Sequence, residues 1–575
     1  MRRLHSSRLQ LITLALLALV LPFELKTPIV SLGPIAITNV EAILYAVIVL
    51  WVIMVLRYRQ LHWTLAHSAV LAWISVQLLA AIFAPLEREA AIKFALRSAG
   101  GALLFFIAAE WMRTPRRAAA IMSAIAIGAV MSALAGWLEV ESSAAQNALL
   151  IFKTQATLIG DQLRAGGPFQ YANTAAMYWE ASLPILIAVG VWWSIERAQR
   201  RWSIIVLAAS VIVIEAIILS SSRAALVSTV LALLIMIAAD RVNTIRSGVG
   251  WPAAFVLSAL IGLIGVQLFV NPLLAARLKS EGDDSWFQAD VHPAQVDLIA
   301  AAGENITQTV SITNTSVRAW PSTGSQPVYL SYHWIQPATQ HVLILDGARS
   351  RLPHDLIPGQ SATIIANVKV PKTLGTLTLQ WDVVQENVTW FGERGSPVAD
   401  VNVDITSTRR LTAAMPQPPP SQLSNASSPP RAELWRAGLK MWLTHPLLGI
   451  GPDNFRHVYG MYLGQTEFDD RITANSWSVE VLATTGSVGM IVSMLSMIAM
   501  LILARRHWPS LTTRSARVLA LGLSVALLTF FVHGVVDYFM EFTPTYSLFW
   551  LSGGLLIGLM TGTGNAKVAR TADRV

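Results

Sequence analysis

Two arginines in this sequence stand where an apolar stretch meets water, and both could bind an anion. Arg223 follows a run of serines that ends at Ser222, whose hydroxyl could donate to the same anion. Arg431 opens an amphipathic stretch that carries Trp435 on the same helical face. A guanidinium donates two hydrogen bonds at once, which suits a diphosphate. The plain alternatives are a snorkelling Arg223 and an Arg431 that contacts lipid headgroups.

A second candidate loop reads RAGGPFQYANTAAMYW and enters another apolar stretch. It contains Arg164, two glycines that allow close backbone approach, and Tyr171, whose ring could form a wall for a sugar or an isoprenoid. An ordinary turn with interfacial aromatic residues is the alternative. Arg164 and Tyr171 are therefore candidate substrate-binding residues.

Acidic side chains that could activate an acceptor hydroxyl come after the amphipathic stretch. Asp453 lies in GIGPDNF, and Asp469 and Asp470 lie in a later polar run. A general base must lie close to the hydroxyl that it deprotonates, whereas most aspartates on a loop are simply solvated. His533 and Asp537 predict either a buried hydrogen-bonded pair or a substrate contact. No DxD, HExxH or similar spacing occurs, so we predict chemistry that needs neither a metal nor a cofactor.

The elements that must position these residues are membrane helices. The 575 residues are 54% hydrophobic and 13% charged, and many apolar stretches approach the length of about 18 residues that crosses a bilayer core. The net charge is +8, and the Arg and Lys residues collect in every second short loop, on one side of the membrane. This asymmetry predicts cytoplasmic termini, and we predict no nucleic-acid partner. We predict about twelve spans, at 9–23, 37–56, 68–84, 95–111, 118–138, 172–193, 204–219, 224–239, 253–270, 477–503, 518–536 and 547–560.

A polar insert separates the spans into two groups. Alternating runs such as SATIIANVKV and TLTLQWDVV, with turn residues between them, predict an extracytoplasmic immunoglobulin-like β-sandwich at 284–408. The other predicted parts are membrane helices at 1–270 and 476–563, a Pro/Ser linker at 409–430, an extracytoplasmic interfacial helix and loop at 431–475, and a cytoplasmic tail at 564–575.

Taken together, these residues resemble the O-antigen ligase-like family of polytopic membrane glycosyltransferases. The segments that carry the resemblance are RAGGPFQYANTAAMYW, SSSRAAL, RAELWRAGLKMWLTHPLLGIGPDNF and ANSWSVEVLATTGSVG. The long loop between the ninth and tenth spans is also similar. The resemblance covers most of the membrane part but not the β-sandwich.

The resemblance implies an all-α bundle of the GT-C type and metal-free transfer of a glycan from a polyprenyl-diphosphate donor. It implies that Arg223 and Arg431, with Arg164 as a weaker candidate, bind the diphosphate. The family has a histidine before the asparagine that corresponds to Asn475, and here Ala474 takes that place. Another group must then serve as the base, or the acceptor differs, or the chain is not a working ligase.

We therefore predict a ligase or polymerase in the bacterial plasma membrane. Its partners would be the lipid-linked glycan, an extracytoplasmic acceptor and membrane lipid. Two alternatives stay open at this point. A transporter or flippase for the same lipid would need ionisable residues near the membrane midplane. A non-catalytic protein would bind glycans through the β-sandwich and use the helices as an anchor.

Overall fold

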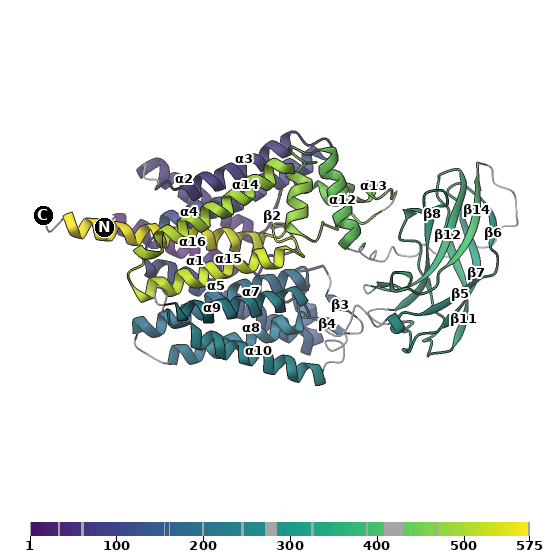
Figure 1. Ribbon diagram of the computed structural model, residues 1–575, viewed down its shortest axis with the longest axis horizontal. Coiled ribbons are helices and arrows are strands. Elements are labelled where there is room, and N and C mark those ends of the chain that lie inside the picture. Colours follow the sequence, from purple (N-terminus) through teal and green to yellow (C-terminus); the bar gives the residue numbers. More distant parts are fainter. Residues whose placement is uncertain are drawn as a thin grey trace.

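The computed structural model describes residues 2–32, 35–58, 62–154, 156–159, 162–197, 201–242, 247–270, 284–323, 327–386, 389–407, 429, 431–465 and 468–572. Helices gather at one end of the molecule and strands at the other (Figure 1). Both termini lie at the end of the helical bundle that is remote from the strands (Figure 1). We call the opposite end of the bundle, which faces the strands, its strand-side end.

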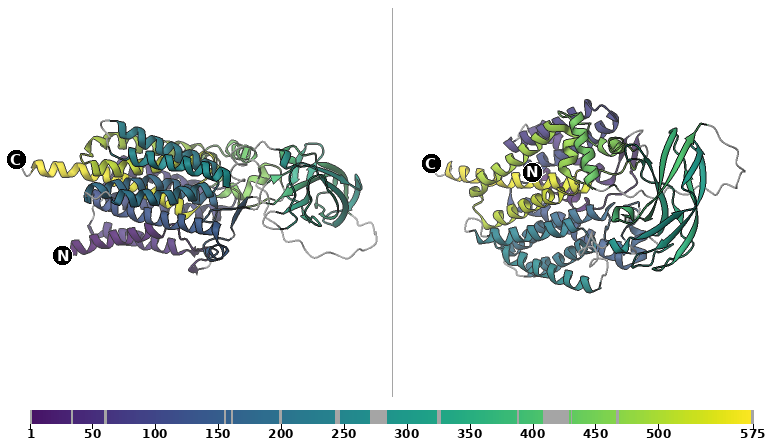
Figure 2. Two further views of the ribbon diagram at one scale, coloured as in Figure 1. Left: turned by 90° about the horizontal axis from the view of Figure 1, so that it is seen from below. Right: turned by 45° about the vertical axis from the view of Figure 1, so that its right-hand side comes forward.

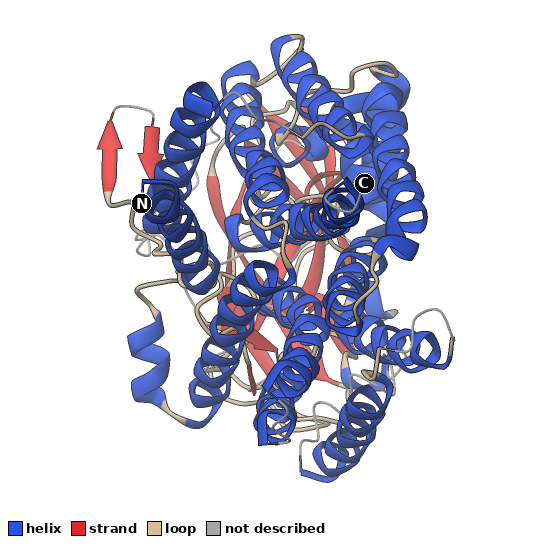
Figure 3. Ribbon diagram, turned by 90° about the vertical axis from the view of Figure 1, so that its left-hand side faces the viewer, coloured by secondary structure: helices blue, strands red, loops and turns tan. Residues whose placement is uncertain are grey.

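The bundle is built from two stretches of the chain, one before and one after the strands. Its long helices are α1 (Arg2–Val20), α2 (Asn39–Tyr58), α3 (Leu65–Ile82), α4 (Arg88–Trp111), α5 (Pro115–Glu141), α7 (Ala172–Arg197), α8 (Arg201–Leu219), α9 (Arg223–Arg241), α10 (Gly250–Val270), α14 (Trp477–His507), α15 (Arg514–Gly534) and α16 (Thr543–Ala572). Figure 3 looks along these helices and shows them side by side, with the strands behind.

Nine helices in the described part of the chain are long and apolar enough to cross a membrane. The helices α1 and α8 add the shorter apolar stretches Arg8–Val20 and Ile204–Leu219. A helix rises 1.5 Å per residue, so about 20 apolar residues cover the hydrocarbon core of a bilayer. The protein is therefore mostly helical and of the polytopic membrane type. The helix α16 continues to Ala572, into the segment predicted as a cytoplasmic tail at 564–575.

The helix α7 lies at the centre of the bundle, since every residue in its apolar stretch is buried. Small residues let neighbouring helices approach closely. A Cβ at Gly522 of α15 would lie 2.4 Å from the Cβ of Ala188 in α7. A Cβ at Gly554 of α16 would lie 2.4 Å from the carbonyl oxygen of Phe105 in α4. These contacts fix the helices that carry the candidate site residues.

The strand domain, residues 284–407, comes after α10 in the chain. It contains β5 (Ala289–Pro293), β6 (Asp297–Ala301), β7 (Asn305–Asn314), β8 (Val328–Gln336), β9 (His341–Ile344), β10 (Ser350–Arg351), β11 (Ser361–Lys369), β12 (Gly375–Gln385), β13 (Thr389–Trp390) and β14 (Ala399–Thr406), with single turns of 3-10 helix at η1 (Asp284–Trp286) and η2 (Gly392–Arg394). A 7-stranded sheet has the order β10-β8-β12-β14-β6, with β9 beside β8 and β13 beside β12. A 3-stranded sheet has the order β11-β7-β5.

The two sheets share one hydrophobic core. Residues on β11 alternate between exposed and buried, as a half-buried strand requires. The indole rings of Trp334 and Trp381 from the larger sheet are fully buried among them. The strands of the larger sheet pair antiparallel, except that β14 and β6 run parallel.

Shorter elements lie between the bundle and the strand domain. They are the hairpins β1 (Val30–Leu32) with β2 (Ile35–Ile37) and β3 (Thr157–Ile159) with β4 (Gln162–Arg164), and the helices α6 (Ser143–Leu149), α12 (Arg431–Thr444) and α13 (Asn454–Tyr462). A turn of 3-10 helix, η3 (Trp508–Ser510), continues from α14 at the other end. Figure 2 shows α12 and α13, in green, between the bundle and the strands. The linker predicted at 409–430 lies outside the described residues apart from Pro429.

Candidate functional site

The helix α12 lies at the strand-side end and carries two of the predicted residues. Its buried face is formed by Leu434, Ala437, Gly438 and Met441, which explains why this amphipathic stretch packs onto the protein. Arg431 is the exposed first residue of the helix. Trp435 donates its indole N–H to the carbonyl oxygen of Ala474 at 3.1 Å. Trp435 therefore ties α12 to the segment that precedes α14.

A backbone contact between two glycine turns fixes the segment between α12 and α13. The amides of Ile450 and Gly451 donate to the carbonyls of Ala483 and Thr484 at 3.0 Å and 2.9 Å. Gly486 has φ of 65°, which interrupts α14, and a Cβ there would lie 2.3 Å from the carbonyl oxygen of Leu447. Only glycine accepts this conformation and this approach without strain. The GIG and TTG sequences thus join the turn after α12 to the break in α14.

The same turn delivers α13 to the bundle. Asn454 is fully buried, and its side-chain amide donates to the carbonyl of Leu86 at 2.6 Å and to that of Ile450 at 2.8 Å. Asp453, beside it, pairs with Arg456 through contacts of 2.7 Å and 2.9 Å. His457 lies 4.0 Å from the same carboxylate. Asp453 is therefore held by its own helix, in front of the loop that leads into α4.

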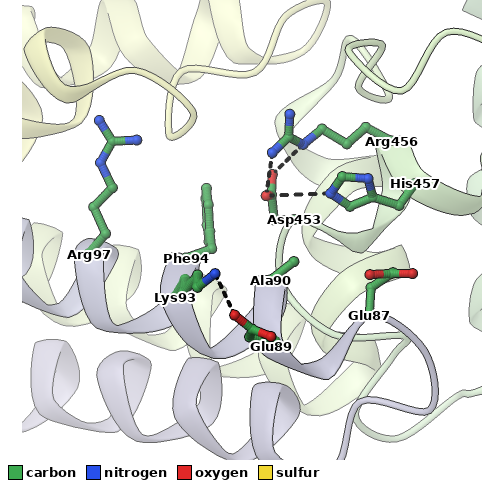
Figure 4. A pocket seen from close by; sticks show the side chains of 9 residues that line it. All are labelled: Glu87, Glu89, Ala90, Lys93, Phe94, Arg97, Asp453, Arg456 and His457. Carbon is green, nitrogen blue, oxygen red and sulfur yellow. Dashed lines mark hydrogen bonds and ion pairs between the residues drawn. The ribbon is translucent and has the colours of Figure 1, made fainter. Parts of the chain in front are cut away.

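A cavity of about 490 Å³ opens between α4 and α13. Figure 4 shows Lys93 and Arg97 on the α4 wall, and Arg456 with its partner Asp453 on the facing wall. Arg97 forms an ion pair with Glu41 at 2.7 Å and donates to the hydroxyl of Thr543 at 2.6 Å. The cavity is thus lined by cations of both walls, together with the acidic groups that pair with them. Its lining residues are Glu87, Glu89, Ala90, Lys93, Phe94, Arg97, Asp453, Arg456 and His457.

A buried polar network leads from α9 to the neighbourhood of Arg431. On α9, Ser228 donates to Glu180 of α7, and Glu180 lies 2.8 Å from the imidazole of His533 on α15. The other ring nitrogen of His533 lies 3.8 Å from Asp537. Glu180 and His533 are almost completely buried, so each is stabilised by the other.

Asp537 is the outer member of this network. Burial alone would raise its pKa, but the nearby imidazole and charge of His533, the amide of Tyr538 and the charge of Arg431 hold the pKa of the Asp537 carboxyl below its ordinary value. Arg431 therefore lies within electrostatic reach of Asp537. His533 and Asp537 form the pair that the sequence predicts, and the structure adds Glu180 and Ser228 to it.

Arg223 opens α9, five residues before Ser228. Its side chain is exposed, and Ser222 caps the helix by accepting from the amide of Ala225 at 3.4 Å. One turn of helix contains 3.6 residues, so Ser228 lies less than two turns below Arg223. The network that starts on the helix of Arg223 thus ends within electrostatic reach of Arg431, although the two arginines are far apart in sequence.

Tyr171 joins the same surface. Its ring lies 5.6 Å from that of Phe542, measured between centroids, and 40% of the residue is exposed. Asp469 pairs with Arg471 at 2.7 Å and 2.8 Å, and both are electrostatic neighbours of Tyr171. Asp470 is exposed and adds its negative charge near Arg471.

Arg164 and Asn475 have mainly structural contacts. Arg164 is buried, and its guanidinium donates to the carbonyl of Ser220 and to the side chain of Asn173, both at 2.6 Å. Asn475 is half-buried with φ of 47°, a left-handed conformation that asparagine tolerates well. Beside it, the amide of Ala474 donates to Glu480 at 2.8 Å.

Sequence reasoning missed Arg97, Arg456 and Glu541. Arg97 had a signal, since an ionisable residue inside an apolar span is a functional candidate by default. The sequence around Arg456 and Glu541 carries no such signal, because only the fold brings these two residues close to each other. Burial raises the pKa of the half-buried Glu541 to about 8, with Asp453 adding to this and Arg456 opposing it.

Among the residues that the structure describes, no group of three or more His, Cys, Asp or Glu side chains could hold a metal ion.

Comparison with known proteins identifies one part of the chain. Residues 387–494 match the protein-family model described as O-Antigen ligase. This segment contains α12, α13, both glycine turns and the first part of α14, and it also includes the last strands of the strand domain, β13 and β14, which the expected resemblance left out. No curated protein matches the chain.

At the level of the family, the match indicates a ligase- or glycosyltransferase-like enzyme that works on a lipid-linked glycan and an acceptor. It confirms the resemblance to the O-antigen ligase-like family for the segment that it covers, and the long apolar helices indicate that this segment belongs to a multi-pass membrane protein.

Proposed function

We propose that this protein transfers a glycan from a polyprenyl-diphosphate donor to an acceptor, without a metal, at the outer face of the bacterial plasma membrane. The observation that carries the proposal is the network from Ser228 to Asp537, which links the helix of Arg223 to a carboxylate within electrostatic reach of Arg431. Arginines at such a place bind phosphate oxygens through two hydrogen bonds each.

The chemistry of this transfer is mainly electrostatic. A diphosphate is a good leaving group, and its negative charge grows as the glycosidic bond breaks. Arg431 and Arg223 would stabilise this charge where it develops, which is the kind of contribution that commonly dominates enzymatic rate enhancement. The cavity between α4 and α13, with Arg456 and Arg97 in its walls, would hold the sugar next to the diphosphate.

The orientation of the protein is part of the same proposal. Both termini lie at the end of the bundle remote from the strands, in agreement with cytoplasmic termini (Figure 1). Residues 284–408 would then form an extracytoplasmic immunoglobulin-like β-sandwich above the site.

The test compares two arginines of the same helix. The purified protein in nanodiscs is given undecaprenyl-diphosphate-linked oligosaccharides extracted from bacterial membranes, together with membrane acceptors from the same cells. Arg431→Ala is expected to reduce transfer by roughly 10²–10³-fold, as removal of one charge-stabilising donor does. Arg436→Ala is the control, because Arg436 is exposed and pairs only loosely with Glu433 at 3.7 Å.

Full transfer by both Arg431→Ala and Arg223→Ala would end the proposal. Movement of the lipid across liposomes that contain only this protein, without transfer, would point instead to a flippase.

A further inference from the structure

The segment between α15 and α16 joins the two cationic regions of the site. At one end, Asp537 lies beside His533 and within electrostatic reach of Arg431. At the other end, Thr543 accepts a hydrogen bond of 2.6 Å from Arg97, which lines the cavity. Glu541 lies between these two anchors, two residues before Thr543.

The backbone on both sides of Glu541 is held in place. The hydroxyl of Thr545 donates to the carbonyl of Phe539 at 2.6 Å and to that of Phe542 at 3.0 Å. The ring of Phe539 is buried and stacks on Trp477, while the ring of Phe542 packs on Tyr171. Glu541 is therefore presented from a fixed loop, as a catalytic side chain must be.

The carboxylate of Glu541 differs from the other acidic groups at the site. Asp453 pairs with Arg456, and Asp469 pairs with Arg471. Asp537 contacts His533. Among the described residues, by contrast, none forms a hydrogen bond or an ion pair with Glu541. Its lone pairs are available to a substrate.

We propose that Glu541 is the general base that accepts the proton of the acceptor hydroxyl. This inference rests on the proposed function, and it assigns the role for which the family uses a histidine where this chain has Ala474. The acceptor oxygen forms a bond to the anomeric carbon, and the bond from that carbon to the diphosphate oxygen breaks. The electron pair leaves with the polyprenyl diphosphate, and the acceptor proton passes to the Glu541 carboxylate.

The charges around Glu541 fit this role. The carboxylates of Asp453, Glu480 and Asp537 disfavour its charged form, and Arg456 favours it. The phenols of Tyr171 and Tyr538 are further neighbours. Burial and the nearby carboxylates raise the pKa of Glu541 to about 8. A base is most effective when its pKa lies near the working pH.

The experiment replaces Glu541 and measures transfer in nanodiscs with the same donor and acceptors. Glu541→Gln is expected to lower kcat by roughly 10²–10⁴-fold, while the KM for the lipid-linked donor changes by less than about twofold. Glu541→Asp is expected to recover part of the rate. The wild-type kcat should rise with pH towards a plateau above pH 8, and this rise should be absent in Glu541→Gln. Glu433→Gln, on the exposed face of α12, is the control.

Each outcome separates this inference from the proposed function. A wild-type rate in Glu541→Gln, with transfer abolished in Arg431→Ala, would overturn the base assignment and leave the function standing. Weakened binding of undecaprenyl diphosphate by Glu541→Gln would also overturn it, because the residue would then act in donor binding. A folded, donor-binding Glu541→Gln that has lost both kcat and its pH dependence supports the assignment.

Discussion

Two loops at the strand-side end of the bundle differ in whether their charged side chains have partners within the protein. At the loop before α7, Glu139 of α5 accepts from Lys153 and from the amides of Gly166 and Gly167 at 3.1 Å and 2.8 Å. Lys153 and Glu139 are completely buried. In the described part of that loop, the buried charges have their partners within the protein, and such an arrangement stabilises a fixed backbone.

The loop before α16 differs, because one of its acidic groups has no partner in the part of the chain that the structure describes. We call the loop before α7 the balanced loop and the loop before α16 the unbalanced loop. Asp537 and Glu541 lie among further carboxylates, and burial together with Asp453 disfavours the charged form of Glu541. A group left in such surroundings costs stability and is retained where it serves a function. Buried charge alone therefore does not mark a site, and our proposal for Glu541 rests instead on a carboxylate without a partner among the described residues.

The largest change in the free energy of unfolding is expected from a substitution at the balanced loop. Glu139→Ala should lower the free energy of unfolding by roughly 3–5 kcal/mol, because it leaves the Lys153 ammonium buried without a partner. Thermal unfolding in detergent, monitored by tryptophan fluorescence, measures the loss. The control is Glu141→Ala, an exposed position on the same helix. If the two variants unfold alike, the loop is not held by this pair.

A smaller change, which stabilises the protein instead of destabilising it, is expected from a substitution at the unbalanced loop. The pKa of Glu541 is raised in the folded state, so the folded protein binds more protons and loses stability as the pH rises from about 4.5 to 8. Glu541→Gln removes this loss and should stabilise the protein at pH 8 by about 0.5–2 kcal/mol, although transfer falls. Unfolding at pH 5 and pH 8 checks the sign, and equal stability at both pH values in the wild type would contradict it.

The smallest effect is expected where the strand domain touches the site. The imidazole of His341 on β9 donates to the carbonyl of Leu463, just after α13, at 3.2 Å. Removing this exposed contact by His341→Ala should cost about 0.5–1 kcal/mol of local stability. Hydrogen exchange at residues 460–465 measures it. His354→Ala, whose partner Gln360 lies in the strand domain itself, should leave that exchange unchanged.

Much of the architecture could be predicted from the sequence, because apolar length and alternation are local signals. The spans and the strand-forming segment are read in this way. Local pattern also singled out Arg431 and the His533–Asp537 pair. It did not reveal that the guanidinium of Arg164 is occupied by Ser220 and Asn173. It also missed Glu541, since its surroundings come from α13, α14 and α15, which meet only in the folded chain.

The contact between the two glycine turns has a consequence for how such a protein diversifies. The turn after α12 is joined to α14 by main-chain groups, from Pro446 to Gly451 on one side and from Ala483 to Val488 on the other. These hydrogen bonds use main-chain groups only, so apart from the glycines they do not depend on the identity of the side chains. Substitutions of the other side chains near this joint are therefore expected to leave the scaffold beneath unchanged.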